Sequence, residues 1–284
     1  MTTAGAASAS AASAASATSA AYVVLIPARL ASTRLPDKPL ADIAGKPMIV
    51  RVAEQAARSS AARVVVAADS SAVADAVRQA GFEVVITRLD HRSGTDRLAE
   101  AAGILGLADD VIVVNMQGDE PELPPALLDK VAQCLAQDAD CVMATAAHAI
   151  DNLRDWFNPN VVKVVLDSAS RALYFSRAPI PYHRDGLRAR AGSPDADADA
   201  DADALRALAQ ARPLRHIGLY AYRGQFLKAY SRMATTALEG IEALEQLRVL
   251  FNGFSIKVVV ATQAPAAGVD TPEDLAAVRR RFGA

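Results

Sequence analysis

The segment LIPARLASTRLPDKPL occupies residues 25–40, within and just after an apolar run that begins at residue 22. The apolar run predicts a short buried strand that ends near Pro27. The segment after it combines small residues and prolines with Arg29, Arg34 and Lys38, and Lys46 follows a few residues later. A strand that enters a small-residue loop with spaced cations is typical of a phosphate site, because backbone N–H groups and positive charges can surround a polyanion there.

The length of this loop favours a functional role over an ordinary connection with surface cations. Such connections have about four to six residues, whereas about twenty residues separate the first strand from the first helical pattern here. The loop matches neither G-x-x-x-x-G-K-[ST] nor G-x-G-x-x-G. This disfavours P-loop ATPases and classical dehydrogenases.

Composition limits the classes of partner. The chain has 284 residues, is 52% hydrophobic and carries a formal net charge of -2. A charge so close to zero gives no general attraction to nucleic acid or to an anionic membrane, so we expect neither as a partner. Cys134 and Cys141 lie in apolar surroundings without metal-ligand spacing, which is typical of buried thiols in a reducing compartment.

We expect one domain at residues 22–284, preceded by an extension of low complexity. Residues 1–21 are almost entirely Ala, Ser and Thr, lack the features of a secretory or mitochondrial leader, and are expected to be disordered. Residues 191–212 contain the tract DADADADADA, which has too little apolar surface to fold alone. We expect a mobile loop inserted in the domain; cation binding by its carboxylates is the less favoured alternative.

The order of apolar segments predicts an α/β fold with a Rossmann-like, mostly parallel sheet flanked by helices. The expected strands lie at residues 22–26, 64–67, 84–87 and 111–115, and the expected helices at 48–58, 71–80 and 95–105. Residues 141–222 are rich in strand-like runs, which predicts an antiparallel excursion from that sheet. The α/β pattern then returns with a helix at 239–251, a strand at 256–261 and a helix from Thr271.

Two acidic motifs follow apolar runs. NMQGDEP, residues 115–121, places Asp119 just beyond a strand, where open α/β sheets bind ligands and a carboxylate can hold Mg²⁺. An ordinary turn explains this motif equally well. GVDTPED, residues 268–274, fits a capped helix start, with Thr271 or Asp270 as the cap. Asp270 becomes interesting only if it lies beside Asp119.

Two further segments allow both a structural and a functional interpretation. HRSGTDR, residues 91–97, begins a helix, and its Ser, Gly and Thr suit either a simple cap or contact with a base edge or a phosphate. LRHIGLYAY, residues 214–222, contains His216, and a lone histidine is more often structural than catalytic. Glu245 and Gln246 fit the polar side of an amphipathic helix.

Taken together and in this order, the segments resemble the family of 3-deoxy-manno-octulosonate (Kdo) cytidylyltransferases. The resemblance covers about residues 22–282 apart from the extension and the insertion. The wording ASTRLP favours Kdo over the related sialic acid enzymes. The matching segments are IPARLASTRLPDKPL, GKPMI, HRSGTDRLAE, VNMQGDEP, FNPNVVKVVLD, ALYFSRAPIP, LRHIGLYAYR, EALEQLRVL and GVDTPEDL.

The resemblance implies a fold of the nucleotide-diphospho-sugar transferase type. It also implies a homodimeric enzyme of the bacterial cytoplasm, in which the antiparallel excursion forms the dimer interface. Such an enzyme joins CTP and Kdo to give CMP-Kdo and pyrophosphate for lipopolysaccharide synthesis, with Mg²⁺ as cofactor. The resemblance places the metal on Asp119 and Asp270. It gives catalytic roles to both aspartates, to Lys38 and to Arg34.

The resemblance also implies the binding residues. The nucleotide would contact Ala28, Arg29, Arg34, Lys38, Ser93, Gly94, Thr95 and Gln117. Kdo would contact Gln117, His216, Tyr220, Glu245 and Gln246, with Arg177 as a weaker candidate.

The chain departs from the family pattern in two places. Asp37 stands where the family usually has Gly, and the insertion replaces a shorter connection. Two alternatives remain open: another acidic sugar, such as sialic acid or an 8-amino Kdo analogue, and a non-catalytic sugar-nucleotide-binding protein. The presence of Lys38 and both aspartates disfavours the second.

Overall fold

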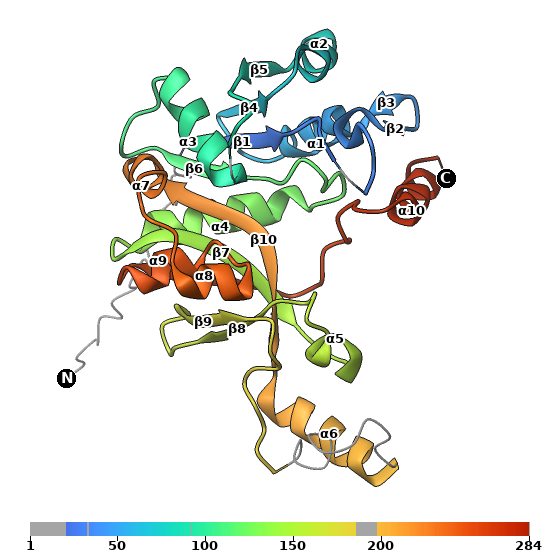
Figure 1. Cartoon of the computed structure of the whole chain (residues 1–284), viewed down its shortest axis with the longest axis vertical. Coiled ribbons are helices and arrows are strands. Elements are labelled where there is room, and N and C mark those ends of the chain that lie inside the picture. The colour runs from blue at the N-terminus through green and yellow to red at the C-terminus, as the bar shows by residue number, and fades with distance from the viewer. Residues whose placement is uncertain (1–20, 33, 92, 186–197, 284) are drawn as a thin grey trace, which may run out of the picture.

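The computed structural model describes residues 21–32, 34–91, 93–185 and 198–283. Almost all of the extension at residues 1–21 and the first part of the insertion therefore lie outside the described residues. One central sheet carries helices on both faces, and an arm that contains β8, β9, α5 and α6 extends from it (Figure 1). None of the described helices combines the length and the apolarity needed to cross a membrane.

A nine-stranded sheet in the order β11-β7-β10-β6-β1-β4-β5 organises the fold, with β8 and β9 added beside β10. β6, β1, β4 and β5 are parallel neighbours, and β11 is parallel to β7. This confirms the expected mostly parallel α/β sheet. The strands are β1 (Tyr22–Ala28), β4 (Arg63–Ala68), β5 (Glu83–Ile86), β6 (Ile112–Asn115), β7 (Cys141–Ala149), β8 (Lys163–Leu166), β9 (Ala172–Ser176), β10 (Leu214–Arg223) and β11 (Ser255–Ala261).

β10 interrupts the parallel order and so carries the expected antiparallel excursion. It lies antiparallel between β6 and β7, and its N-terminal end also pairs with β8. Its register with β7 shifts between Ile217 and Tyr220, around Gly218. A register shift of this kind re-aims the side chains on both sides of it, and here those include His216 and Tyr220.

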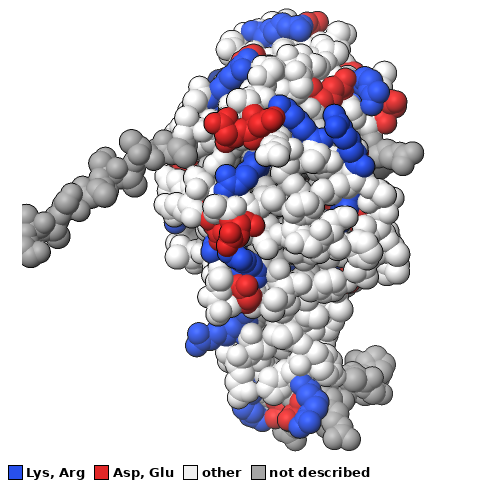
Figure 2. Space-filling model, turned by 90° about the vertical axis from the view of Figure 1, so that its left-hand side faces the viewer, with Lys and Arg blue, Asp and Glu red and all other residues white. Residues whose placement is uncertain are grey.

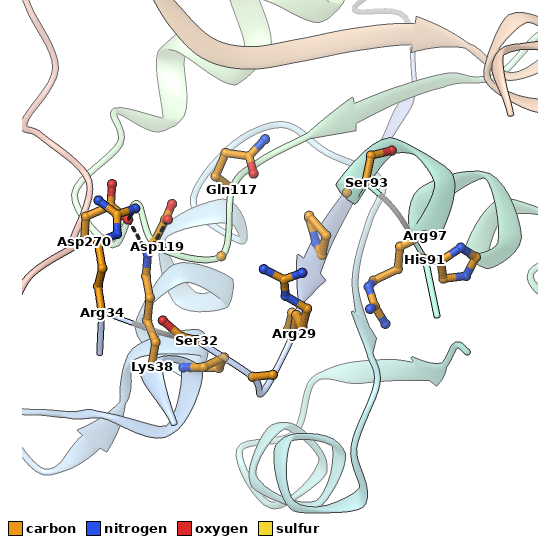
Figure 3. Close-up of a pocket in the computed structure, with 16 residues that line it drawn as sticks. Arg29, Ser32, Arg34, Lys38, His91, Ser93, Arg97, Gln117, Asp119 and Asp270 are labelled. Atoms are coloured by element: carbon orange, nitrogen blue, oxygen red, sulfur yellow. Dashed lines mark hydrogen bonds and ion pairs between the residues drawn. The ribbon is translucent and has the colours of Figure 1, made fainter. Parts of the chain in front are cut away.

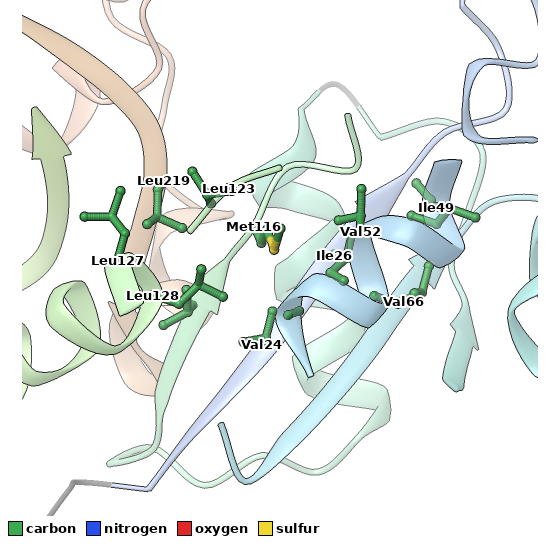
Figure 4. Close-up of a cluster of buried hydrophobic side chains, with 14 of the residues drawn as sticks. Val24, Ile26, Ile49, Val52, Val66, Met116, Leu123, Leu127, Leu128 and Leu219 are labelled. Carbon is green, nitrogen blue, oxygen red and sulfur yellow. The ribbon is translucent and has the colours of Figure 1, made fainter. Parts of the chain in front are cut away.

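Helices hold the two faces of the sheet. α1 (Met48–Ala56), α2 (Ser71–Gln79), α4 (Pro125–Gln137) and α10 (Pro272–Phe282) cover one face, and α3 (Gly94–Ile104), α7 (Gly224–Tyr230) and α9 (Leu247–Phe251) cover the other. On the first face, Ile26, Ile49, Met116 and Leu128 belong to one buried cluster (Figure 4). Each large aliphatic side chain buried in this way contributes about 1.5–3 kcal/mol, so the cluster fixes the strands that end at the site.

The two cysteines are part of the packing. Both are free thiols, and Cys141 lies fully inside the first cluster. Burial raises the pKa of the Cys141 thiol to about 11, so little of it is thiolate at neutral pH. This agrees with the buried thiol expected at Cys141, whereas Cys134 is only partly buried.

A single helix expected at residues 239–251 is two helices in the structure, so that expectation was wrong. α8 (Ala237–Glu242) ends at Ala243, whose φ of 49° and ψ of 51° are left-handed, and α9 begins at Leu247. The left-handed conformation ends a helix, and apolar spacing does not reveal it. The break places Glu245 and Gln246 in a turn rather than along a helix surface.

The mobile loop expected at residues 191–212 is also corrected, because residues within it form α6 (Ala198–Ala211). Ala is the strongest helix former, so an Asp-Ala tract has local helix propensity even without apolar surface. Ala204, Ala207 and Leu208 share one helix face and are buried in a cluster with Trp156 of α5 (Leu153–Phe157). The end of the tract and the residues after it supply the docking surface that the tract alone lacks.

Gly118 sets the distance between the chain segments that leave β1 and β6. A Cβ atom at this position would lie 2.7 Å from the backbone carbonyl oxygen of Pro27 and 3.5 Å from Cδ1 of Ile49. A backbone oxygen cannot give way as the end of a flexible side chain can. A side chain at Gly118 therefore forces the two segments apart.

We predict that Gly118→Ala lowers the free energy of unfolding by about 1–3 kcal/mol, the usual cost of overpacking. Urea denaturation followed by circular dichroism measures this change. Gly103→Ala is the matched control, because Gly103 lies in α3 with nothing within 4 Å of its Cβ position. Gain of a methyl group in an open helix position should be neutral or stabilise by up to about 1 kcal/mol. Unchanged stability of Gly118→Ala would contradict the argument.

Candidate active site

A cleft of about 710 Å³ opens beyond the carboxyl ends of β1 and β6, where open α/β sheets bind their ligands. Its walls come from the loop after β1, the start of α3, the loop after β6 and the segment before α10. Figure 3 shows cationic, carboxylate and amide side chains that converge on it from these four segments. The predicted site residues that line the cleft are Ala28, Arg29, Arg34, Lys38, Ser93, Gly94, Gln117, Asp119 and Asp270.

The loop after β1 is fixed at both ends. The backbone N–H of Leu30 donates to Oδ1 of Asp69 at 2.9 Å, which ties the loop to the end of β4. The loop then forms the 3-10 helix η1 (Lys38–Leu40) and the hairpin of β2 (Asp42–Ile43) and β3 (Lys46–Pro47) before α1. Lys46 takes no part in the cleft, because its ammonium pairs with Glu54 of α1.

The backbone at Asp37 adopts a conformation that favours glycine, the residue that the resemblance led us to expect in this position. Asp37 has φ 50° and ψ 33°, in the left-handed region, and it directly precedes η1. Gly adopts this conformation freely, and Asp is one of the few other residues that visit it routinely. The replacement of Gly by Asp therefore preserves the turn that presents Lys38.

The ammonium of Lys38 lies between two carboxylates. Nζ is 2.6 Å from Oδ2 of Asp119 and 2.9 Å from Oδ1 of Asp270 (Figure 3). Arg34 adds a contact of 3.0 Å between Nη2 and Oδ1 of Asp270, at a more exposed position. Burial alone would lower the pKa of Lys38, but attraction and hydrogen bonds from the two aspartates raise it above its usual value. Lys38 is therefore a cation at any working pH.

Backbone contacts bring the two aspartates together. The N–H of Val269 donates to the carbonyl oxygen of Asp119 at 2.8 Å, which joins the loop after β6 to the segment before α10. Thr271 caps α10 in a capping box with Asp274, whose carboxylate also accepts from the N–H of Asp270 at 3.1 Å. The cap and the carboxylate site expected from GVDTPED thus coexist on neighbouring residues.

The donor set fits Mg²⁺. Mg²⁺ is commonly bound through one or two carboxylates, with substrate phosphates and water as the other ligands. Two aspartates that share one cationic neighbour, beside an open cleft lined by arginines, match that pattern. Within the described part of the chain, no three His, Cys, Asp or Glu side chains gather as a metal site, so the protein's own ligands in the cleft would be these two carboxylates.

The cap residue and the first residue of α3 line the cleft, whereas the side chain of the second residue, Thr95, does not. Ser93 caps the helix by accepting from the N–H of Asp96, and the Cβ position of Gly94 is 3.7 Å from Pro27. Thr95 does not line the cleft but donates through Oγ1 to Oε1 of Glu245 at 2.9 Å. A contact between Thr95 and the nucleotide therefore stays a prediction, whereas its hydrogen bond with Glu245 was not expected from the sequence.

Most of the predicted sugar residues lie beside the cleft rather than on its wall, around β10. Gln117 is the connection, because it lines the cleft and its Nε2 donates to the carbonyl oxygen of Gly218 at 3.3 Å. The His216 ring packs edge-on against Phe175, with centroids 5.0 Å apart, and lies 5.4 Å from the ring of Tyr220. Predicted nucleotide and sugar residues therefore meet at Gln117.

His216 is held as a neutral ring. The Thr145 hydroxyl donates its one hydrogen to the Leu219 carbonyl oxygen at 2.8 Å. Toward His216 it can therefore only accept, so Nε2 of His216 carries the proton and donates to it at 2.9 Å. Nδ1 is then the acceptor atom of the ring. Burial lowers the pKa of His216 to about 3, so the ring does not exchange protons near neutral pH.

Three buried polar side chains in this region have atoms without a hydrogen-bond partner among the described residues. They are Asn115, through Nδ2 and Oδ1, Glu120, through Oε2, and Gln246, through Nε2. Burial first, and the charge of Asp119 second, raise the pKa of Glu120 to about 8. Buried polar atoms in native proteins nearly always have a partner, so each of these atoms is available to a ligand group or an ordered water.

Arg177 has structural partners. Its Nε and Nη1 donate to the carbonyl oxygens of Glu242 at 2.6 Å and Pro159 at 2.9 Å. The fully buried Lys163 beside it donates to three backbone carbonyls, one of them that of Arg177. These bonds fasten α8 to the arm, and a contact between Arg177 and a sugar remains a prediction.

The sequence analysis missed the support behind the cleft. Arg97 lines it and donates to Asp69 at 3.2 Å and to Thr87 at 2.6 Å, with Arg97 and Asp69 almost fully buried. His91 also lines the cleft and pairs with Glu100. The available signals were an Asp at the end of an apolar run and an Arg inside HRSGTDR, but neither identifies its partner.

Three comparisons with known proteins agree with this geometry. A family model described as cytidylyltransferase matches residues 23–258. A 3-deoxy-manno-octulosonate cytidylyltransferase from Herminiimonas arsenicoxydans is 57% identical over 263 residues, which cover 92% of this chain and 99% of that protein.

Solved structures give the same relationship. The structure of a CMP:2-keto-3-deoxy-manno-octonic acid synthetase complexed with CTP is 40% identical, with a TM-score of 0.81 over 93% of this chain and 99% of that one. A 4-diphosphocytidyl-2C-methyl-D-erythritol synthase from Anaerococcus prevotii shares only the fold, with 11% identity and a TM-score of 0.55 over 93% of this chain and 99% of that one.

The neutral ring of His216 predicts a loss of stability in acid. Its pKa is about 3 when folded and about 6.5 when unfolded, so the unfolded chain binds more protons between these values. Stability is therefore fully present above pH 6.5 and falls as the pH drops toward 3. When the pH is lowered from 7 to 5.5, the free energy of unfolding should fall by about 1 kcal/mol more in the wild type than in His216→Gln. Urea denaturation at the two pH values measures this difference. Equal losses would contradict a ring that is held neutral in the folded protein.

Proposed function

The chain belongs to the cytidylyltransferase family, and from this premise we propose that it transfers the CMP group of CTP to Kdo, giving CMP-Kdo and pyrophosphate. The product is an activated Kdo for lipopolysaccharide synthesis. The observation that carries the proposal is the joining of Lys38, Asp119 and Asp270 in one cleft that arginines border. The 57% identity to a named Kdo cytidylyltransferase and the 40% identity to a synthetase complexed with CTP support the choice of both substrates.

The proposed nucleotide site uses three features of the cleft. Arg29, Arg34 and Lys38 offer positive charge to the triphosphate, and their side chains come from one loop held by Asp69. The N-terminal end of α3 adds backbone N–H groups and the positive end of a helix dipole. Ala28 and Gly94 leave room for the base close to the backbone.

The reaction needs positioning and charge stabilisation rather than a covalent intermediate on the protein. The anomeric hydroxyl of Kdo attacks the α-phosphorus of CTP, a new P–O bond forms, the bond to the β-phosphate breaks, and the hydroxyl proton is lost to solvent. Bound Mg²⁺, which we propose as cofactor, supplies neutralisation of phosphate charge and a lower pKa for the attacking hydroxyl. Asp119 and Asp270 would hold it, and the cations of the loop would orient the leaving pyrophosphate.

The proposed sugar site lies beside the cleft, across Gln117. His216, Tyr220 and Gln246 offer polar atoms there, and Gln246 has an amide nitrogen without a partner in the described structure. Glu245 connects this group with α3 through Thr95. A polyhydroxylated acid suits such a lining, because each hydroxyl can pair with one of these atoms.

We predict that Asp119→Asn and Asp270→Asn each lower kcat/KM for CMP-Kdo formation at least about 100-fold, because each loses a metal-binding charge at the reacting phosphate. Pyrophosphate release with CTP and Kdo measures the rate, and sialic acid and other sugar acids test the acceptor. Asp110→Asn removes one charge from the exposed loop before β6 and should behave as wild type. Near-normal rates in either cleft variant would exclude the metal assignment, and turnover with another acid alone would exclude Kdo.

We further propose that the enzyme works as a homodimer in the cytoplasm, with the arm and α8 in the interface. Leu173 of β9 is 61% exposed and Ile241 of α8 is 82% exposed, large values for apolar side chains. Hydrogen bonds from Ser176 and Arg177 to Glu242 hold the two elements together. Figure 2 shows one face of the molecule, on which acidic and basic side chains are interspersed rather than gathered by sign. Apolar contact therefore supports self-association better than charge does.

Ile241→Asp should shift the protein toward the monomer, because a charge buried in an apolar interface lacks a partner. Light scattering after size-exclusion chromatography, over a range of concentrations, measures the mass. Leu89→Asp is the control, since Leu89 is also exposed, at 74%, but lies on the loop after β5. A wild-type monomer, or an Ile241→Asp dimer as tight as wild type, would contradict the proposed interface.

A further inference from the structure

We infer that Lys38 is an internal counter-ion of Asp119 and Asp270, and that it gives up its contacts with these carboxylates to a metal ion when the nucleotide binds. The inference rests on the proposed function, since it assumes that Asp119 and Asp270 form the metal site. Its basis is the position of one ammonium between both carboxylates, at 2.6 and 2.9 Å.

The carboxylates need a cation whether or not a metal is present. Asp119 and Asp270 come from distant parts of the sequence, and the backbone hydrogen bond from the N–H of Val269 to the carbonyl oxygen of Asp119 brings them side by side. Two negative charges so close repel each other, and a positive charge between them offsets this repulsion. Lys38 supplies that charge from a side chain that is only 14% exposed.

The ammonium and the metal compete for the same oxygen atoms. Mg²⁺ binds carboxylate oxygens at about 2.0–2.1 Å, and Oδ2 of Asp119 and Oδ1 of Asp270 are the atoms that Lys38 contacts. A cation that close to both oxygens would also repel the ammonium. Occupation by one therefore requires the departure of the other.

Lysine suits this exchange better than the neighbouring arginine. Lysine carries a compact charge on a flexible four-carbon stem, so its head can move while its backbone stays fixed. The backbone of Lys38 is held in η1 beside the buried Pro39. Arg34 contacts only Asp270 and its side chain is 64% exposed, so it does not bridge the pair. Lys38 is the bridging group.

The cleft provides a destination for the displaced ammonium. Lys38 lines the same cleft as Arg29 and Ser32, where we propose that the triphosphate binds. Phosphate oxygens attract the ammonium away from the carboxylates and so vacate the metal position. By linkage, nucleotide and metal then favour each other's binding, and the free enzyme holds metal weakly.

The experiment measures Mn²⁺ binding to the full-length protein without nucleotide or sugar, by electron paramagnetic resonance of free Mn²⁺. Mn²⁺ accepts the same oxygen ligands as Mg²⁺. Lys38→Met keeps the stem and removes the charge, and it should bind Mn²⁺ at least about tenfold more tightly than wild type, equivalent to about 1.4 kcal/mol. Lys38→Arg keeps a cation and should stay near wild type.

Two further variants assign the effect to this position. Lys46→Met removes the same charge from a lysine that pairs with Glu54 outside the cleft, and should leave Mn²⁺ affinity unchanged. Asp119→Asn combined with Lys38→Met should lose the gained affinity. Circular dichroism and thermal melting show that each variant is folded. A folded Lys38→Met with unchanged or weaker Mn²⁺ affinity would overturn the inference.

The result separates this inference from the proposed function. A gain of affinity in Lys38→Met without turnover of CTP and Kdo by the wild type would support the exchange and contradict the proposed substrates. Turnover by the wild type without a gain of affinity in Lys38→Met would support the function and overturn the exchange.

Discussion

The attraction between Lys38 and the two carboxylates of Asp119 and Asp270 is the interaction on which the site depends. It links three segments that are far apart in the sequence: the loop after β1, the loop after β6 and the segment before α10. The parallel strands place two of these segments at one edge of the sheet, and the capped start of α10 brings in the third. The fold thus brings the charges together, and the ammonium of Lys38 neutralises the two carboxylates where they meet.

The candidate site has two parts that differ in their physical character. The cleft is open, and cations and a helix N-terminus dominate it, which suits a polyanion. The region around β10 is partly buried and contains hydrogen-bonding groups such as Tyr220, Gln246 and a histidine that stays uncharged. Hydrogen bonds of Gln117 with Gly218 and of Thr95 with Glu245 connect the two parts. A ligand in one part can therefore influence the other through the start of α3 and the register shift in β10.

The sequence predicted the parallel sheet well, because buried strands read as apolar runs and the helices between them have regular spacing. It predicted Asp119 and Asp270 as a pair only through resemblance, since each motif alone fits an ordinary turn or cap. The sequence did not predict the turn at Ala243 or the left-handed backbone at Asp37, because both depend on local backbone conformation rather than on the pattern of side chains. The partners of Arg177 and Thr95 depend on tertiary contacts from residues far along the chain. Spacing within a segment carries no information about those contacts.

The docking of α6 has a consequence for how this region can change in evolution. The residues of α6 that cluster with Trp156 are Ala204, the last residue of the Asp-Ala repeat, and Ala207 and Leu208, which follow it. The packed face of the helix therefore lies at and after the end of the repeat. Gain or loss of an Asp-Ala unit upstream changes the length of the segment without rotating that face. A change in the number of Asp-Ala units there would therefore leave the packing of Ala207 and Leu208 in the cluster with Trp156 unaltered.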